Sequence, residues 1–468
     1  PLTNYTVARV QKNWKGNTLL GGMVTSVNRA LDQPYLEDFM VRNAFTAGID
    51  FTQYFKNRLY YIDVKGMLSS LHGSAGAITA LQNSVAHYYQ RASSADYLGV
   101  DPTRRSLTGT GGYVKVGRKG NAKWNFSETF TWSSPGFDLN DMGYMKETDY
   151  LMNETEIMYR QTDIWKIFRY NAFTLSQKNM WNYGGTPFSN NASLRWQSMT
   201  MNRYEWDVKE TFAWNWLDSR LLRGGPDVRF GSYFLTSAKF NTDKAKRMMF
   251  MLKYEGDHNF EGNRFNTISP SLTFRLGNHV YLSGQLDYAW NTDEMQYVAT
   301  TSPLSSSSLA PYYYVMGHMD QKTYGLTLKL QVNVTPDISI QFYGAPFTSI
   351  AKYDDFKLAA DTKSHTFENR FQRIDPDHLT YVDGIYTIGE GAGQMPFRNP
   401  DFRFNEFRSN LVARWEYLPG STLYFVWEHR MSNRDNWYSS GWGSNLDRMW
   451  GLPATNTFMI KMNYWFNL

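Results

Sequence analysis

The last sixth of the chain alternates regularly between apolar and polar positions. In the predicted strand Phe458–Leu468 one face is apolar or aromatic throughout, and it carries Phe458, Ile460, Met462, Tyr464, Phe466 and Leu468. The predicted strand Asn405–Tyr417 has a charged face, which carries Glu406, Arg408, Asn410, Arg414 and Glu416. A soluble strand would have to bury that face, whereas in a membrane barrel it meets a wet lumen while the apolar face meets lipid. With Ser421–Arg430, which repeats the alternation, the pattern predicts an all-β, transmembrane antiparallel β-barrel of the outer membrane.

Short turns separate the alternating runs at a regular spacing. Nine are predicted, at Lys12–Gly16, Phe55–Arg58, Gly117–Gly120, Gln161–Ile164, Met201–Arg203, Asn241–Lys244, Leu276–Asn278, Thr335–Asp337 and Leu418–Gly420. Their Gly, Asn, Pro and Asp residues are those that tight turns favour. The connections at the opposite ends of the strands are longer, which is typical of outer-membrane barrels with short periplasmic turns and long extracellular loops. Nine turns join about 18 strands, and the closing strand makes about 19.

An odd number of strands affects how the barrel closes. The final strand and the strand at Tyr5–Gln11 would both run toward the periplasm, so they would not form an antiparallel pair with each other. An unpaired strand edge is costly in a bilayer. We therefore expect residues 1–468 to be one barrel domain that upstream sequence completes to about 20 to 22 strands.

Composition argues against several other classes of protein. No run approaches the roughly 18 apolar residues that a membrane helix needs, and the mean hydropathy is −0.53. The 32 Tyr and 16 Trp suit the aromatic girdles of a barrel. A net charge of +5 without a basic run argues against a nucleic-acid partner. The absence of Cys excludes disulfides and thiolate metal sites, and we expect no cofactor.

Two of the long connections have features of their own. Ala75–Arg91 places Ile78, Leu81, Val85 and Tyr88 at helical spacing, which predicts a short amphipathic helix on the barrel rim. The span Phe347–Phe404 is too long to be a structureless loop. We expect it to fold over the mouth as a lid or into the lumen as a plug.

Candidate site residues are few. The sequence contains eight His, none at metal-ligand spacing with another, and it contains no catalytic motif, so we expect neither a metal site nor an enzyme. Asp138, Asn140 and Asp141 carry oxygen ligands that suit calcium, although solvated turn residues are the favoured interpretation. The last long loop holds Trp437, Tyr438, Trp442 and Trp450 among Gly, Ser, Asn, Asp and Arg. Such aromatic faces suit a sugar platform, but rim packing or contact with a neighbouring protein would use the same residues and is the favoured interpretation.

Several segments together resemble one family. They include Tyr5–Lys12 (YTVARVQK), Gly21–Arg29 (GGMVTSVNR), Thr335–Phe347 (TPDISIQFYGAPF) and, most specifically, Asn399–Trp427 (NPDFRFNEFRSNLVARWEYLPGSTLYFVW). The chain resembles the C-terminal domain of unknown function of Bacteroidota outer-membrane proteins, which follows a family 9 carbohydrate-binding-like domain. The resemblance spans nearly the whole chain and implies an outer-membrane barrel with more sequence upstream. It carries no catalytic residues.

Three functional classes remain after these observations. The first is a binding or scaffold barrel that docks outer-membrane proteins, lipoproteins or extracellular proteins through its loops. The second is a channel for saccharides or other solutes, and the third is a membrane-embedded enzyme. Because no predicted strand shows a ladder of one charge sign on its lumen face, which ion-selective pores use, we favour the scaffold.

Overall fold

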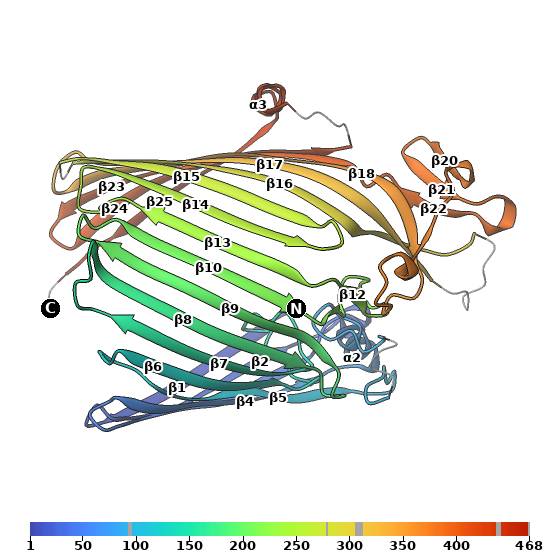
Figure 1. Cartoon of the computed structure of the whole chain (residues 1–468), viewed down its shortest axis with the longest axis horizontal. Helices are drawn as coiled ribbons and strands as arrows, with labels where there is room; N and C mark the ends of the chain where they lie inside the picture. Colours follow the sequence, from blue (N-terminus) through green and yellow to red (C-terminus); the bar gives the residue numbers. More distant parts are fainter. Residues whose placement is uncertain (92–95, 278, 305–311, 437–440, 467–468) are drawn as a thin grey trace.

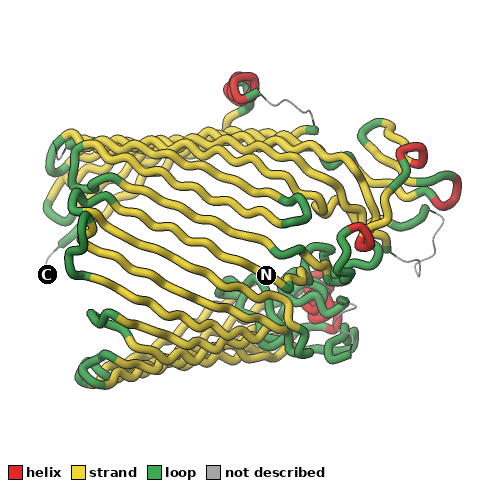
Figure 2. Tube along the Cα trace, in the orientation of Figure 1, coloured by secondary structure: helices red, strands yellow, loops and turns green. Residues whose placement is uncertain are grey.

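The computed structural model of the chain is dominated by one antiparallel sheet (Figures 1 and 2). It describes residues 1–91, 96–277, 279–304, 312–436 and 441–466. Of the 20 strands in this sheet, β19 (Phe371–Arg373) has three residues and the other 19 have nine or more. The total agrees roughly with the predicted number. Among the described residues, no helix is both long and apolar enough to cross a membrane.

The long strands pair with their neighbours in chain order. The first ten are β1 (Thr3–Trp14), β2 (Thr18–Arg29), β3 (Asn43–Phe55), β4 (Tyr60–His72), β5 (Ser106–Arg118), β6 (Trp124–Ser133), β7 (Tyr150–Gln161), β8 (Phe168–Trp181), β9 (Pro187–Thr200) and β10 (Glu205–Trp214). The other nine are β13 (Tyr233–Asn241), β14 (Met248–Asn259), β15 (Arg264–Leu276), β16 (Val280–Thr301), β17 (Tyr313–Asn333), β18 (Ile338–Ala359), β23 (Phe402–Leu418), β24 (Ser421–Asp435) and β25 (Ala454–Asn463).

The remaining elements lie in the connections. They are α1 (Pro34–Glu37), α2 (Ala75–Gln82), α3 (Trp442–Trp450), the hairpin β11 (Trp216–Asp218) with β12 (Val228–Phe230), the sheet β20 (Leu379–Val382), β21 (Ile385–Ile388) and β22 (Met395–Arg398), and the 3-10 turns Glu368–Arg370, Pro376–His378 and Gly391–Gly393. The helix predicted over Ala75–Arg91 is therefore shorter than expected. Ser74 begins it as the N-cap, since its side chain accepts a hydrogen bond from the Ala77 amide.

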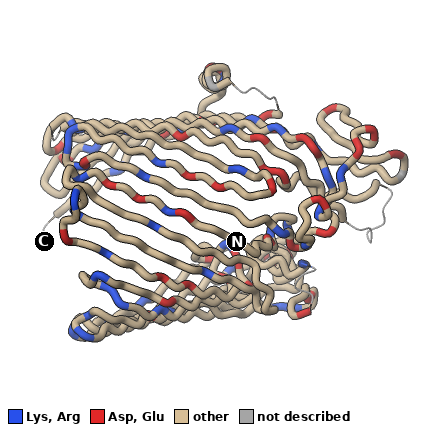
Figure 3. Tube along the Cα trace, viewed as in Figure 1, with Lys and Arg blue, Asp and Glu red and all other residues tan. Residues whose placement is uncertain are grey.

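The sheet curls into a wall with two different ends (Figure 1). All nine predicted turns join strands at one end, here called the short-turn end, where Lys and Arg gather (Figure 3). The opposite end, the long-loop end, carries α2 and the sheet β20–β22. Within the described residues β1 pairs with β2 and β25 with β24, and these two edge strands are not paired with each other. Closure of the barrel stays a prediction.

Register separates the two faces of the wall. Leu282 on β16 lies opposite Leu330 on β17, while the next pair along, Ser283 and Lys329, points to the other face. The apolar face is the outer one, because α3 lies outside the curved wall (Figure 1) and the ring of its Trp450 is 4.8 Å from that of Phe407. Alternation therefore places polar side chains such as Ser283 and Lys329 on the inner face at this level of the wall.

The long connection between β18 and β23 is shorter than its predicted bounds. Strand β18 continues to Ala359 and β23 begins at Phe402, so the connection spans residues 360–401 rather than Phe347–Phe404. The extra strand length is stabilised by packing on the sheet β20–β22. Buried Phe356 and Leu358 of β18 form one cluster with Ile388 and Phe397 of that sheet.

Candidate functional site

Buried polar contacts fix the connections at the long-loop end. The Nε2 atom of His87 lies 2.9 Å from Asp138 Oδ2, and both side chains are almost fully buried. The Nδ1 atom of the same ring lies 2.8 Å from the Pro135 carbonyl oxygen. Asp138 also accepts a hydrogen bond from the Asn140 amide. Asp138 is therefore a buried anchor between the β4–β5 and β6–β7 connections, and its interpretation as a solvated turn residue was wrong.

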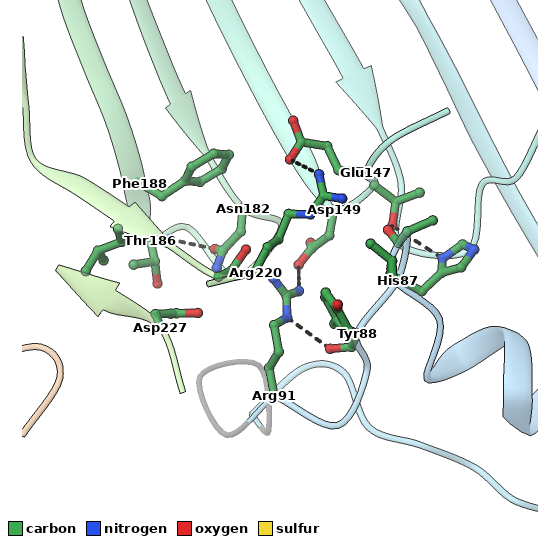
Figure 4. Close-up of a pocket in the computed structure, with 15 residues that line it drawn as sticks. His87, Tyr88, Arg91, Glu147, Asp149, Asn182, Thr186, Phe188, Arg220 and Asp227 are labelled. Atoms are coloured by element: carbon green, nitrogen blue, oxygen red, sulfur yellow. Dashed lines mark hydrogen bonds and ion pairs between the residues drawn. The ribbon is translucent and has the colours of Figure 1, made fainter. Parts of the chain in front are cut away.

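A second buried pair, Arg91 and Asp149, lies near His87 (Figure 4). Arg91 donates to Asp149 Oδ2 at 2.8 Å, and Tyr97 donates to the same oxygen at 2.6 Å. Burial, followed by the hydrogen bond to Asp149, raises the pKa of Tyr97 well above its usual range. The cavity at this junction measures about 30 Å³, which is room for about one water molecule. The buried pairs at this junction therefore act as a structural clamp between the connections.

A larger pocket opens nearby on the inner face of the wall. Its volume is about 390 Å³, and it is lined by Trp216, Asp218, Phe230, Tyr233, Leu235, Asp257, Asn259, Asn263, Arg264, Phe265, Asn291, Thr292, Asp293, Gln296, Met319 and Gln321. We call it the mouth pocket. Its position follows from register, because Asn291 of β16 lies opposite Phe265 on one side and Gln321 on the other. Strands of the wall form its floor, and the β11–β12 hairpin forms one side.

The mouth pocket combines aromatic faces with amides and carboxylates. The rings of Trp216 and Tyr233 pack edge to face with centroids 5.5 Å apart. Asn291 donates to Gln321 Oε1 at 3.0 Å, which fixes two of the amides. Rings that contact the C–H face of a sugar, beside groups that hydrogen-bond its hydroxyls, are a common arrangement for a polar organic ligand. Sequence reasoning missed these residues, because they come from many elements and share no motif.

Of the four predicted aromatic residues, Trp450 is the one whose side chain the structure describes. Trp437 and Tyr438 lie outside the described residues. Trp442 begins α3, and Trp450 ends it, 56% exposed and packed on Phe407 at the outer face. Trp450 is therefore not brought to the inner face. Their role as a sugar or partner surface stays a prediction.

The side chains that were predicted to suit calcium form ion pairs and hydrogen bonds with other residues of this chain. Asp141 forms an ion pair with Arg29, and Asn140 accepts a hydrogen bond from the Met145 amide. Within the described residues, no group of three or more His, Asp or Glu side chains is arranged to hold a metal ion.

A comparison with models of protein families shows which family the chain belongs to. The model described as "Domain of unknown function (DUF5916)" matches residues 1–468. The chain belongs to this family. Membership covers the whole of the wall and its connections, and the family's description assigns it no activity.

Solved structures of similar shape were also found. The siderophore receptor PirA from Acinetobacter baumannii matches with a TM-score of 0.41 and 9% identity, over 96% of this chain and 74% of that chain. A variant of the ferric enterobactin receptor PfeA from Pseudomonas aeruginosa matches with a TM-score of 0.42 and 9% identity, over 95% and 72%. A search of curated proteins finds no match to the chain.

Proposed function

We propose that the chain forms the wall of an outer-membrane β-barrel whose long-loop end docks partner outer-membrane or extracellular proteins. The wall supports the membrane location through its apolar outer face and polar inner face. The family resemblance implies that the protein comes from a Bacteroidota outer membrane and that a carbohydrate-binding-like domain precedes the barrel in the whole protein.

The sheet β20–β22 is the observation that supports docking. At the tip of its first hairpin Tyr381, Val382 and Ile385 are 52%, 66% and 45% exposed. Asp383 and Gly384 have φ values of 48° and 82°, as a tight two-residue hairpin requires. The base of the sheet is anchored, since the Phe356 ring is 4.9 Å from Tyr386 and 5.1 Å from Phe397. An apolar tip on a rigid base is typical of a surface that a partner covers.

Site-specific cross-linking tests this proposal. A photoreactive residue at Val382, introduced in the full chain in its native membrane, is expected to give a discrete protein adduct. The same residue at Lys246, which is exposed at the short-turn end, is the control. Replacing Tyr381 and Ile385 by Ser is expected to abolish the Val382 adduct without affecting barrel assembly. Equal labelling at Val382 and Lys246 would refute docking at this hairpin.

The mouth pocket supports a second function, the binding of a saccharide on the inner face of the wall. Titration of the purified protein with neutral oligosaccharides, followed by calorimetry, tests it. Trp216→Ala and Phe265→Ala are each expected to weaken binding by about tenfold, since each removes a stacking face. Trp450→Ala is the matched control at the outer face. If Trp450→Ala were the only substitution to weaken oligosaccharide binding, the sugar would instead bind at the last long loop.

A further inference from the structure

Two strands of the wall carry the same nine-residue pattern. Residues 124–132 of β6 read WNFSETFTW, and residues 206–214 of β10 read WDVKETFAW. Five positions of the two patterns are identical: Trp124 corresponds to Trp206, Glu128 to Glu210, Thr129 to Thr211, Phe130 to Phe212 and Trp132 to Trp214. Each pattern therefore places a Glu in the middle of a ten-residue strand, with aromatic residues two and four positions to its C-terminal side.

Both Glu side chains belong to the apolar, outer face. Glu210 lies opposite Leu194 of β9, which lies opposite Leu175 of β8, which lies opposite Ile157 of β7. These three apolar side chains are 57%, 55% and 43% exposed. Glu128 shares its face with Phe126 and Phe130, because alternate residues of a strand point the same way. In a membrane barrel both carboxylates would meet the hydrocarbon region.

Each Glu has the same type of partner on the following wall strand. Thr155 of β7 donates to Glu128 Oε2 at 2.6 Å, and Thr236 of β13 donates to Glu210 Oε2 at 2.7 Å. A carboxylate has about four acceptor positions, so one hydroxyl satisfies only part of this capacity. Gln177 of β8 lies opposite Thr155 and extends the polar strip. Ionisable groups at membrane depth are costly, so each is a candidate functional contact.

We propose that the outer face of β6–β10 is covered by a second, different outer-membrane protein that supplies cationic or hydrogen-bond-donating side chains to Glu128 and Glu210. The proposal deepens the docking function above and rests on it. The two carboxylates lie four strand spacings apart, about 20 Å along the wall, so one membrane-embedded partner spans both. A second copy of this chain fits poorly, since a two-fold contact centred between the repeats would bring Glu128 of one copy to Glu210 of the other.

Photo-cross-linking in the native membrane tests the covered face. A photoreactive residue at Leu175 or Leu194, which lie between the repeats, is expected to give a discrete adduct with one other protein, identified by mass spectrometry. Leu286 and Leu330, on the outer face of β16 and β17, are the matched controls and are expected to label lipid. Lipid adducts alone at Leu175, or an adduct of twice the mass of this chain, would overturn the proposal.

Substitution of the two Glu residues tests their part in the contact. Glu128→Leu with Glu210→Leu is expected to reduce the Leu175 adduct about fivefold or more, as expected when hydrogen bonds in a membrane interface are lost. The same variant of the isolated barrel is expected to assemble at least as well as the parent, since it removes charge from a lipid-facing surface. An undiminished adduct would overturn the role of the Glu residues. The Val382 adduct reports docking at the long-loop end separately. A negative result for one of the two docking surfaces therefore does not depend on the result for the other.

Discussion

Arg370 donates hydrogen bonds to both carboxylate oxygens of Glu261, at 2.9 Å to Oε2 and 2.7 Å to Oε1. The guanidinium also donates to the carbonyl oxygens of Ser364, Arg229 and His365, so all five of its N–H groups have an acceptor. Its side chain is 1% exposed. One residue therefore holds the β18–β23 connection against β12 and the β14–β15 turn.

Removal of this clamp is the first prediction. Arg370→Ala removes the cation from the Glu261 carboxylate, which is 12% exposed and keeps the hydrogen bond from the Gly231 amide. Breaking a buried ion pair in this way costs up to about 3–5 kcal/mol. We expect hydrogen exchange to become faster over residues 360–373 and 228–230 while the wall strands stay protected. Lys123→Ala, which breaks the exposed pair with Asp163, is the control and should change little. Unchanged exchange in Arg370→Ala would mean that other contacts hold the connection.

The closing strand tests the assignment of the two faces. Ile460 lies opposite Phe425 on the outer face and is 72% exposed. Arg on the lipid face near the midplane costs about 2–4 kcal/mol. Ile460→Arg is therefore expected to impair membrane assembly more than Asn463→Arg, and more than Met459→Arg, which is at nearly the same depth on the other face. Equal membrane yield and heat-modifiability of the three variants would contradict the register.

Alkaline pH should loosen the connections around α2. Burial raises the pKa of Tyr89 to about 12 from an ordinary value of 10.0, although Arg104 opposes the shift. A phenol whose pKa is higher in the folded protein favours folding below pH 10, and this contribution is lost as the pH rises toward 12. The full contribution is at most about 3 kcal/mol. Proteolytic nicking of residues 75–105 should increase over this interval in the parent and less in Tyr89→Phe, and equal nicking in both would exclude Tyr89 as the cause.

Conductance tests whether the β18–β23 connection caps the lumen. We expect the intact protein to show little steady conductance in planar bilayers, and a version lacking residues 361–395 to show more, because the connection is tied across to β12 at the mouth by Arg370. The Arg370→Ala variant should show intermediate, fluctuating conductance. A large, steady conductance in the intact protein would favour the channel function over the scaffold.

The turns, and the faces of the regularly alternating strands, were predictable from the sequence because both are local properties. In the early strands Leu19, Leu20, Met23 and Val24 do not separate into two faces, so there the turns alone supported the prediction. Neighbouring residues such as Glu406 and Phe407 indicate the two faces of one strand, and turns such as Leu418–Gly420 are predicted from their residue types. The bounds of the β18–β23 connection were predicted wrongly because they depend on long-range contacts, which local patterns do not show. Strand β18 extends to Ala359 because Phe356 packs on Phe397, a contact between residues that are distant in the chain.

The candidate sites could not be predicted from the sequence, because their residues are distant in the chain and meet only in the tertiary structure. The sequence shows that Glu128 and Glu210 occur in matching patterns, but only strand register places each beside a Thr on the outer face. The clamp of Arg370 on Glu261 joins residues 109 positions apart, and no local pattern encodes such a pair. The mouth pocket likewise exists because pairing brings Phe265, Asn291 and Gln321 side by side. The sequence alone therefore determined the antiparallel wall and the two faces of its regularly alternating strands, because both follow from local patterns. Pairing between strands decided which side chains meet at the mouth of the wall and on its surface.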